Sequence, residues 1–185
     1  MNPMKKIVLT FGILSGLIAS AFMSITLPLC HSGKISVESS MVVGYTAIVL
    51  SFLLVFFGIR SYRENAGGTV TFGKAFKVGL LIVLISSAFY VVTWEIIYFG
   101  FAPDFWDVMA DKTAVSMRAK GEPEAKVLAA AKEIRDYRKI YDNPLLNVAF
   151  TLIEPLPVGI VVAAISAAIL RKKPASPPAA ATAVA

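Results

Sequence analysis

The sequence predicts an all-α protein, a bundle of four transmembrane helices with an extracytoplasmic helical hairpin between helices 3 and 4. Two observations support this prediction. Hydrophobic residues make up 57% of the 185 positions and charged residues only 16%, whereas soluble proteins carry about 25% charged residues. The apolar residues also form four long runs. The length of each run is close to that of a helix that crosses a bilayer, about 20 residues. Backbone groups in lipid find no water partners, so each run must be helical.

The four runs define one membrane domain, expected over residues 1–173. The runs extend over residues 7–29, 41–59, 76–99 and 145–170. Lys77 and Glu95 are the only charges in the third run, and Glu154 is the only charge in the fourth. Residues 174–185 are rich in Pro and Ala, and we expect a disordered tail there.

The first run has two interpretations, a retained helix or a cleavable signal peptide. Lys5 and Lys6 precede the run, and the segment 19–21, Ala-Ser-Ala, resembles a cleavage site. The apolar region of a signal peptide is about 7–15 residues long, whereas this run stays apolar to Leu29. Its length therefore favours a retained helix.

Residues 103–141 are expected to form the hairpin. One helix begins near Pro103 and ends at Gly121, and a second runs from Pro123 to about Tyr141. The hairpin is either a solvated element that rests on lipid headgroups or a surface that binds a protein partner. Its short apolar stripes favour the first interpretation.

The positions of the basic residues predict the orientation. The 18 Lys and Arg residues divide into nine on each side of the membrane. All nine on the side of the chain termini lie within five residues of a run, whereas Lys34 alone does so on the other side. Basic residues close to spans face the cytoplasm, so we expect both termini there. The same placement accounts for the net charge of +6 without nucleic-acid binding.

Glu95 and Glu154 are the acidic residues within the runs. Counted from Lys77 and Arg171, each lies roughly 26 Å from the cytoplasmic end of its helix, at about 1.5 Å per residue. Antiparallel neighbouring helices would bring the two carboxyl groups to one layer near the outer surface. Two adjacent carboxyl groups share a proton or hold a cation between them.

Other side chains are expected near the same layer. Pro155 and Pro157 should break the helical hydrogen bonding and free backbone carbonyls beside Glu154. A carboxyl group near the interface can also reach headgroup water or accept a hydrogen bond from a tyrosine, and this purely structural interpretation stays open. The candidate polar or proton site consists of six residues: Glu95, Glu154, His31, Trp94, Tyr90 and Tyr98.

The motifs of common enzymes and metal sites are not present in the sequence. One cysteine and one histidine cannot supply a zinc site, and we predict no metal and no cofactor. In the loop before the third run, Ala75 replaces the Ser or Thr that a phosphate-binding loop requires. The sequence favours a non-enzymatic accessory or interaction protein. The alternative is a proton- or cation-coupled small transporter or channel subunit that uses Glu95 and Glu154.

Two further stripes bear on assembly. Small residues recur at every fourth position of the first run (Gly12, Gly16, Ser20, Ser24) and of the fourth (Gly159, Ala163, Ala167). Such stripes let helix backbones approach closely. Internal packing is the favoured use, and a homo-oligomer stays open. The lipid bilayer is the one partner that the composition itself implies.

Several short stretches carry a resemblance to a known family. They are residues 72–79 (Phe-Gly-Lys-Ala-Phe-Lys-Val-Gly), Trp94-Glu95, Asn143-Pro144, Glu154 with residues 157–159, and the basic residues 171–173. Together they resemble the domain of unknown function 4199, a family of bacterial membrane proteins. Pro155 departs from the family pattern. The resemblance implies a multi-pass protein of the bacterial inner membrane and no assigned activity.

Overall fold

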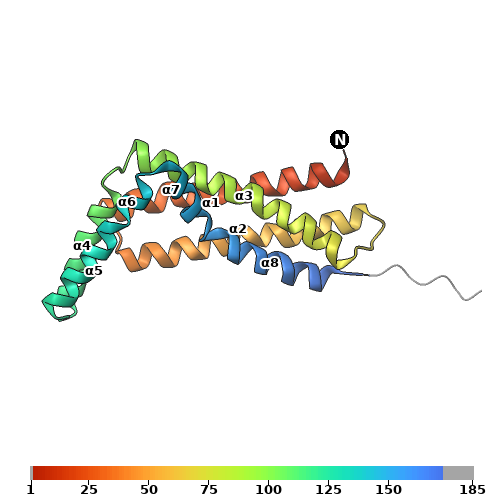
Figure 1. The fold of residues 1–185 in the computed structure, drawn as a ribbon. Coiled ribbons are helices and arrows are strands. Elements are labelled where there is room, and N and C mark those ends of the chain that lie inside the picture. Colours follow the sequence, from red (N-terminus) through yellow and green to blue (C-terminus); the bar gives the residue numbers. More distant parts are fainter. Residues whose placement is uncertain (1, 173–185) are drawn as a thin grey trace, which may run out of the picture.

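The computed structural model describes residues 2–172, and every regular element in that range is a helix (Figure 1). The four segments long and apolar enough to cross a membrane are α1 (Pro3–His31), α2 (Val37–Asn65), α3 (Phe72–Gly100) and the pair α7 (Pro144–Leu152) and α8 (Pro155–Leu170). The predicted all-α class and its four spans are therefore confirmed. The tail expected at 174–185 lies outside the described residues.

The helices extend beyond the apolar runs and begin at polar capping residues. Ser36 precedes α2, and its Oγ accepts a hydrogen bond from the amide of Ser39 at 3.1 Å. Such a cap satisfies a backbone N–H that has no partner within the helix and contributes about 1 kcal/mol. Three other residues cap α1, α3 and α7 in the same way: Asn2, Thr71 and Asn143.

The fourth span is broken into two helices. Pro155 has no amide hydrogen, so the carbonyl of Thr151 loses its helical partner, and Pro157 has the same effect on the carbonyl of Ile153. α7 ends before these prolines and α8 begins at the first of them, with Glu154 at the break. The chain bends at this point (Figure 1).

Helix α3 is the centre of the bundle and packs against α1, α2 and α8. Glycines on the neighbouring helices permit close approaches to α3. A Cβ atom at Gly16 would lie 2.7 Å from the Phe89 side chain, and one at Gly159 would lie 2.4 Å from Cγ1 of Val83. The small-residue stripes of α1 and α8 thus pack against α3 within one molecule.

Two apolar clusters fill the bundle. The larger joins α1, α2, α3 and α8, with Phe52, Val55 and Ile82 fully buried. The second lies at the end where α3 meets the hairpin, and we call this the hairpin end. Its buried members are Met23, Cys30, Trp94, Tyr98, Ala102, Phe105 and Met109.

The hairpin consists of α4 (Phe105–Ala119), α5 (Glu124–Asp136) and the short α6 (Arg138–Tyr141). Gly121 makes the turn with a φ of +76°, a left-handed conformation that glycine adopts without strain. α4 and α5 lie side by side beyond the ends of α1 and α2 (Figure 1). Four small buried residues join them: Ala110, Ala114, Val127 and Ala131.

The outer surface of the bundle is apolar. Ile25, Val42, Ile96 and Ile169 are each more than half exposed, although they come from four different spans. Large apolar side chains distributed in this way around a helical bundle need a hydrocarbon solvent.

Candidate functional site

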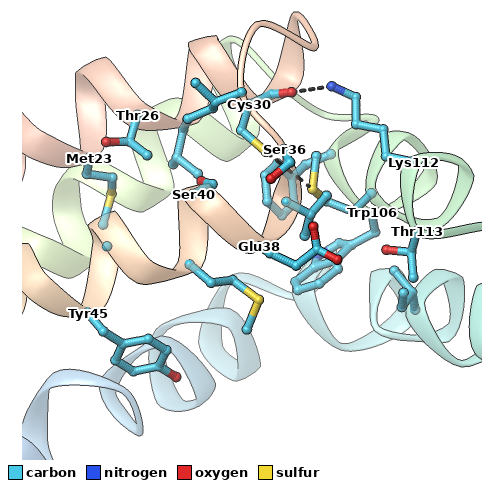
Figure 2. A pocket seen from close by; sticks show the side chains of 18 of the residues that line it. Met23, Thr26, Cys30, Ser36, Glu38, Ser40, Tyr45, Trp106, Lys112 and Thr113 are labelled. Carbon is cyan, nitrogen blue, oxygen red and sulfur yellow. Dashed lines mark hydrogen bonds between the residues drawn. The ribbon is translucent and has the colours of Figure 1, made fainter. Parts of the chain in front are cut away.

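A cavity of about 1000 Å³ opens at the hairpin end of the bundle, between α1, α2, α3 and the hairpin. We call it the hairpin-side cavity. Apolar side chains form most of its lining, with a smaller number of polar groups among them. Figure 2 shows the cavity where α1, α2 and α4 converge. The residues that matter most below are Cys30, Gly44, Tyr45, Tyr90, Trp94 and Glu154.

Helix α1 presents one face of its last turns to the cavity. Met23, Thr26 and Cys30 recur at three- and four-residue spacing, which places them on one side of a helix. Cys30 is buried, and its Sγ lies 4.0 Å from Sδ of Met109 on α4 (Figure 2). This contact fixes the hairpin over one end of the cavity.

Helix α2 presents an unfilled face to the cavity. Gly44 lines it, and a Cβ atom built there would meet no other atom within 4 Å. The neighbouring ring of Tyr45 is about half exposed and projects from α2 on the side away from α1 (Figure 2). The first half of α2 therefore borders open space, whereas its second half is closely packed.

A gap separates α2 from α7. Helix α2 packs extensively against α1 and α8, but within residues 2–172 it has no comparable contact with α7. Tyr45 from α2 and Thr151 and Glu154 from the fourth span nevertheless line the same cavity. Two spanning helices that do not pack together thus bound the cavity on this side.

The carboxylate of Glu154 lines the cavity at the break between α7 and α8. The hydroxyl of Tyr90 on α3 donates a hydrogen bond to its Oε2 at 2.6 Å. The Glu154 side chain is otherwise exposed. Because a charge within a span is costly unless it meets water or a polar group, this carboxylate requires a hydrated or polar neighbour in the cavity.

A buried amide joins α3 to α7 beside this pair. Asn147 is fully buried, and its Oδ1 accepts hydrogen bonds from the indole N–H of Trp94 at 2.7 Å and from the hydroxyl of Thr151 at 3.0 Å. Its Nδ2 donates to the carbonyl of Tyr141 at 3.0 Å. Each of these polar groups is satisfied, as burial requires, so the α7 end of the cavity is rigidly positioned.

Lysines of the hairpin hold it against the starts and ends of the spans. Nζ of Lys112 donates to the carbonyls of Cys30 and His31 in the last turn of α1. A cation at this position also complements the negative end of the helix dipole. Lys120 forms an ion pair with Glu38 at 2.6 Å, at the start of α2. Polar contacts with two spans therefore position the hairpin over the cavity.

Tyr141 lies between the hairpin and the cavity. Burial, and then the nearby charge of Glu154, raise the pKa of Tyr141 to about 12. Its ring lies 4.7 Å from that of Trp106 and 5.9 Å from that of Trp94, measured between centroids. All four of these side chains line the cavity. A carboxyl group and several aromatic rings thus share one region.

The structure brings together three of the six predicted site residues. Tyr90, Trp94 and Glu154 line the hairpin-side cavity. Glu95 follows Trp94 by one residue and so projects about 100° around α3 from it. It does not line the cavity, and within the described chain its buried Oε1 has no hydrogen-bond partner.

His31 and Tyr98 contact acidic residues around the hairpin instead. Nε2 of His31 lies 3.2 Å from Oδ1 of Asp104. The hydroxyl of Tyr98 donates to Oδ1 of Asp142 at 2.8 Å. Both contacts tie the ends of spanning helices to the connecting segments, which is a structural role.

Sequence reasoning missed Asn147, Tyr45, Tyr141 and Lys112. Asn147 carried a signal, because an amide inside an apolar run must find partners when it is buried. The other three carried none, since their roles depend on how α2 and the hairpin are placed. Within residues 2–172 no group of three His, Cys, Asp or Glu side chains could hold a metal ion.

The fold and the cavity define a multi-pass membrane protein with a cavity between its spans. The family model described as a protein of unknown function (DUF4199) matches residues 10–172. The chain therefore belongs to this family, which confirms the resemblance. Neither the curated proteins nor the solved structures include a match to this chain.

Proposed function

We propose that this is a non-enzymatic membrane protein that binds an amphipathic, chain-bearing molecule from the bilayer in the hairpin-side cavity. The observation that carries the proposal is the cavity itself, about 1000 Å³ and mostly apolar. Ligand sites typically measure about 300–1,000 Å³ and combine an apolar lining with a few polar groups. This cavity has that composition, with Glu154 and Tyr90 among its polar groups.

The gap between α2 and α7 supports entry from the lipid. Both helices are parts of spans, so an opening between them would meet hydrocarbon. Tyr45 and Glu154 line the cavity from opposite sides of this gap. A lipid-like molecule can enter sideways here with its chain remaining in apolar surroundings.

The alternative, a proton- or cation-coupled transporter or channel subunit, receives less support from the geometry. It requires Glu95 and Glu154 to act in one site, and only Glu154 lines the cavity. The buried Oε1 of Glu95, which has no hydrogen-bond partner within residues 2–172, is the one observation in its favour.

The same proposal includes a location and an orientation. Basic residues flank the spans at the end opposite the hairpin, for example Lys74 and Arg171, and such residues face the cytoplasm. We place the protein in the bacterial inner membrane with both termini in the cytoplasm. The cavity then lies in the outer leaflet, and the hairpin covers it from the extracytoplasmic side.

A protein partner for the hairpin also belongs to this proposal. Val115 on α4 and Leu128 on α5 are each more than half exposed, which supports contact with a partner or with headgroups. The glycines of the small-residue stripes support a monomeric bundle, because Gly16 and Gly159 are covered by α3.

Quenching of tryptophan fluorescence by brominated acyl chains tests the proposal. The chain has two tryptophans, Trp94 and Trp106, and both line the cavity. Protein reconstituted in phosphatidylcholine vesicles should be quenched when the acyl chains are brominated at mid-chain, since quenching requires contact. Gly44→Leu places a larger side chain in the cavity at a position where a Cβ atom meets no neighbour within 4 Å, and it should reduce this quenching.

Gly73→Leu is the matched control, because a Cβ atom there also meets no atom within 4 Å and Gly73 does not line the cavity. The tryptophan fluorescence of this control variant should be quenched to the same extent as that of the native protein. Equal quenching of Gly44→Leu and the native protein, or no quenching of the native protein, would overturn the proposed function.

A further inference from the structure

One region of the hairpin-side cavity combines a carboxylate with aromatic rings from three separate segments. Tyr45 comes from α2, Tyr90 from α3 and Tyr141 from α6, and all three line the cavity with Glu154. Tyr90 contacts Glu154 directly at 2.6 Å. This region is the part of the lining that can recognise a headgroup.

The charge of Glu154 has no cationic partner among residues 2–172. Its one hydrogen-bond donor is the neutral hydroxyl of Tyr90. Three lysines line the cavity, Lys34, Lys112 and Lys120, and none of them forms an ion pair with Glu154; Lys112 and Lys120 are engaged with the end of α1 and with Glu38. The position beside the Glu154 carboxylate is therefore open to the cationic group of a ligand.

The tyrosine rings suit a cation as well as a chain. Tyr45 and Tyr90 make no ring–ring contact with any other aromatic side chain in the described part of the chain, and Tyr45 is about half exposed. The face of an aromatic ring attracts a cation within about 6 Å, most strongly away from water. Ring faces beside a carboxylate are the arrangement that recognises alkylated ammonium groups.

We infer that the hairpin-side cavity selects amphiphiles with an ammonium headgroup, which Glu154 and the rings of Tyr45 and Tyr90 hold while the chain occupies the apolar part. This inference rests on the proposed function and adds the class of headgroup. An anionic headgroup would instead be repelled by Glu154, and a neutral one would leave the carboxylate without a countercharge.

Chain-matched probes test the headgroup. The probes are dodecyl chains brominated at the far end that carry a trimethylammonium, a maltoside or a sulfate headgroup. Each is titrated into the full-length protein in dodecylmaltoside micelles, with tryptophan quenching as the readout. The trimethylammonium probe should reach half-maximal quenching at roughly one-tenth of the concentration of the maltoside probe, a typical gain for a desolvated cation–π site.

Glu154→Gln is the informative variant, since glutamine keeps an oxygen that accepts from Tyr90. The variant should lose most of the native preference for the trimethylammonium probe over the maltoside probe, measured as the ratio of the two half-maximal concentrations. Tyr45→Leu should lower the same ratio in part.

The outcomes separate the two proposals. Equal quenching by the ammonium and maltoside probes in the native protein, or a preference for the sulfate probe, would overturn the inference and leave the binding cavity standing. If no probe quenched the native protein more than Gly44→Leu, the proposed function itself would be wrong.

Discussion

The hydroxyl of Tyr90 donates a 2.6 Å hydrogen bond to the carboxylate of Glu154, and this bond connects the central helix α3 to the break in the fourth span. The break frees Glu154 from the regular helix and places it in the lining of the cavity. The prolines therefore set the helix geometry, and this bond holds the carboxylate beside α3.

Replacing the donor should therefore cost stability, whereas neutralising the acceptor should not. Tyr90→Phe should lower the free energy of unfolding by about 1 kcal/mol, because a hydrogen bond to the carboxylate is lost. Glu154→Gln should be at least as stable as the native protein, since it still accepts from Tyr90 and carries no charge. Unfolding by sodium dodecyl sulfate, followed by circular dichroism, measures both. Equal losses in the two variants would contradict this role of the bond.

Asn147 should be the most sensitive polar position in the bundle. Asn147→Leu leaves the buried N–H of Trp94 and the carbonyl of Tyr141 without partners, and we expect a loss of about 2–4 kcal/mol. Thr151→Val removes only one donor to the amide and should cost about 1 kcal/mol. The same unfolding assay ranks the two. A smaller effect for Asn147→Leu than for Thr151→Val would show that the amide is not the centre of the network.

Gly159 should tolerate no side chain, whereas Gly73 should. The Cβ atom of Gly159→Ala would lie 2.4 Å from Cγ1 of Val83, and overpacking of this kind costs about 1–3 kcal/mol. Gly73→Ala meets no atom within 4 Å and lies in the first turn of α3, so it should cost no stability. Adding Val83→Ala to Gly159→Ala should recover part of the loss, because the clash is with that side chain.

Lys112 should control the opening of the hairpin. Lys112→Met removes the donor to the carbonyls of Cys30 and His31, so α4 should exchange its amide hydrogens faster, measured by mass spectrometry. Lys126→Met is the control, because Lys126 pairs only with Glu122 on the exposed side of the hairpin. Equal exchange in both variants would assign the attachment of the hairpin to apolar contacts alone.

The hairpin should loosen in acid. Hydrogen bonds from Arg118 and Lys139 lower the pKa values of Glu124 and Asp136 below their ordinary values of 4.5 and 3.8. A lowered pKa in the folded state stabilises the fold above the ordinary value, and this contribution is lost as the pH falls through the folded-state pKa. Amide exchange in α5, corrected for its intrinsic rate, should therefore accelerate below about pH 4.

Glu124→Gln isolates one of these contributions, because the amide cannot ionise. The variant should show a weaker acceleration of exchange in acid than the native chain. If the native chain and Glu124→Gln responded identically, the pair of Glu124 with Arg118 would contribute nothing to the hairpin.

The sequence was sufficient to predict the four spans because the solvent determines them. Long apolar runs with capped ends have one solution in lipid, and the prolines after Glu154 lack the hydrogens that a continuous helix needs. These features are local, so spacing and residue type reveal them. The proximity of Tyr90, Trp94 and Glu154 was predicted from their depth in the membrane. A helical rise of about 1.5 Å per residue gives the depth of each residue along its span, and these three residues share one level.

Rotation about each helix axis could not be read in this way. Glu95 and Trp94 lie at nearly the same depth, but they project in different directions, and only Trp94 lines the cavity. The cavity itself depends on the absence of packing between α2 and α7. A gap between two helices cannot be predicted from either helix alone. This gap arises because α2 packs against α1 and α8 instead of α7.

The two-part fourth span gives the protein a joint at the level of its carboxylate. α8 is anchored in the main core by contacts with α2 and α3, whereas α7 is attached to α3 through Asn147 and continues into the hairpin. Because the prolines remove the hydrogen bonds that would couple the two helices, different contacts hold the two halves of this span. A substitution that disturbs the packing of α7 therefore leaves the contacts of α8 with α2 and α3 in place.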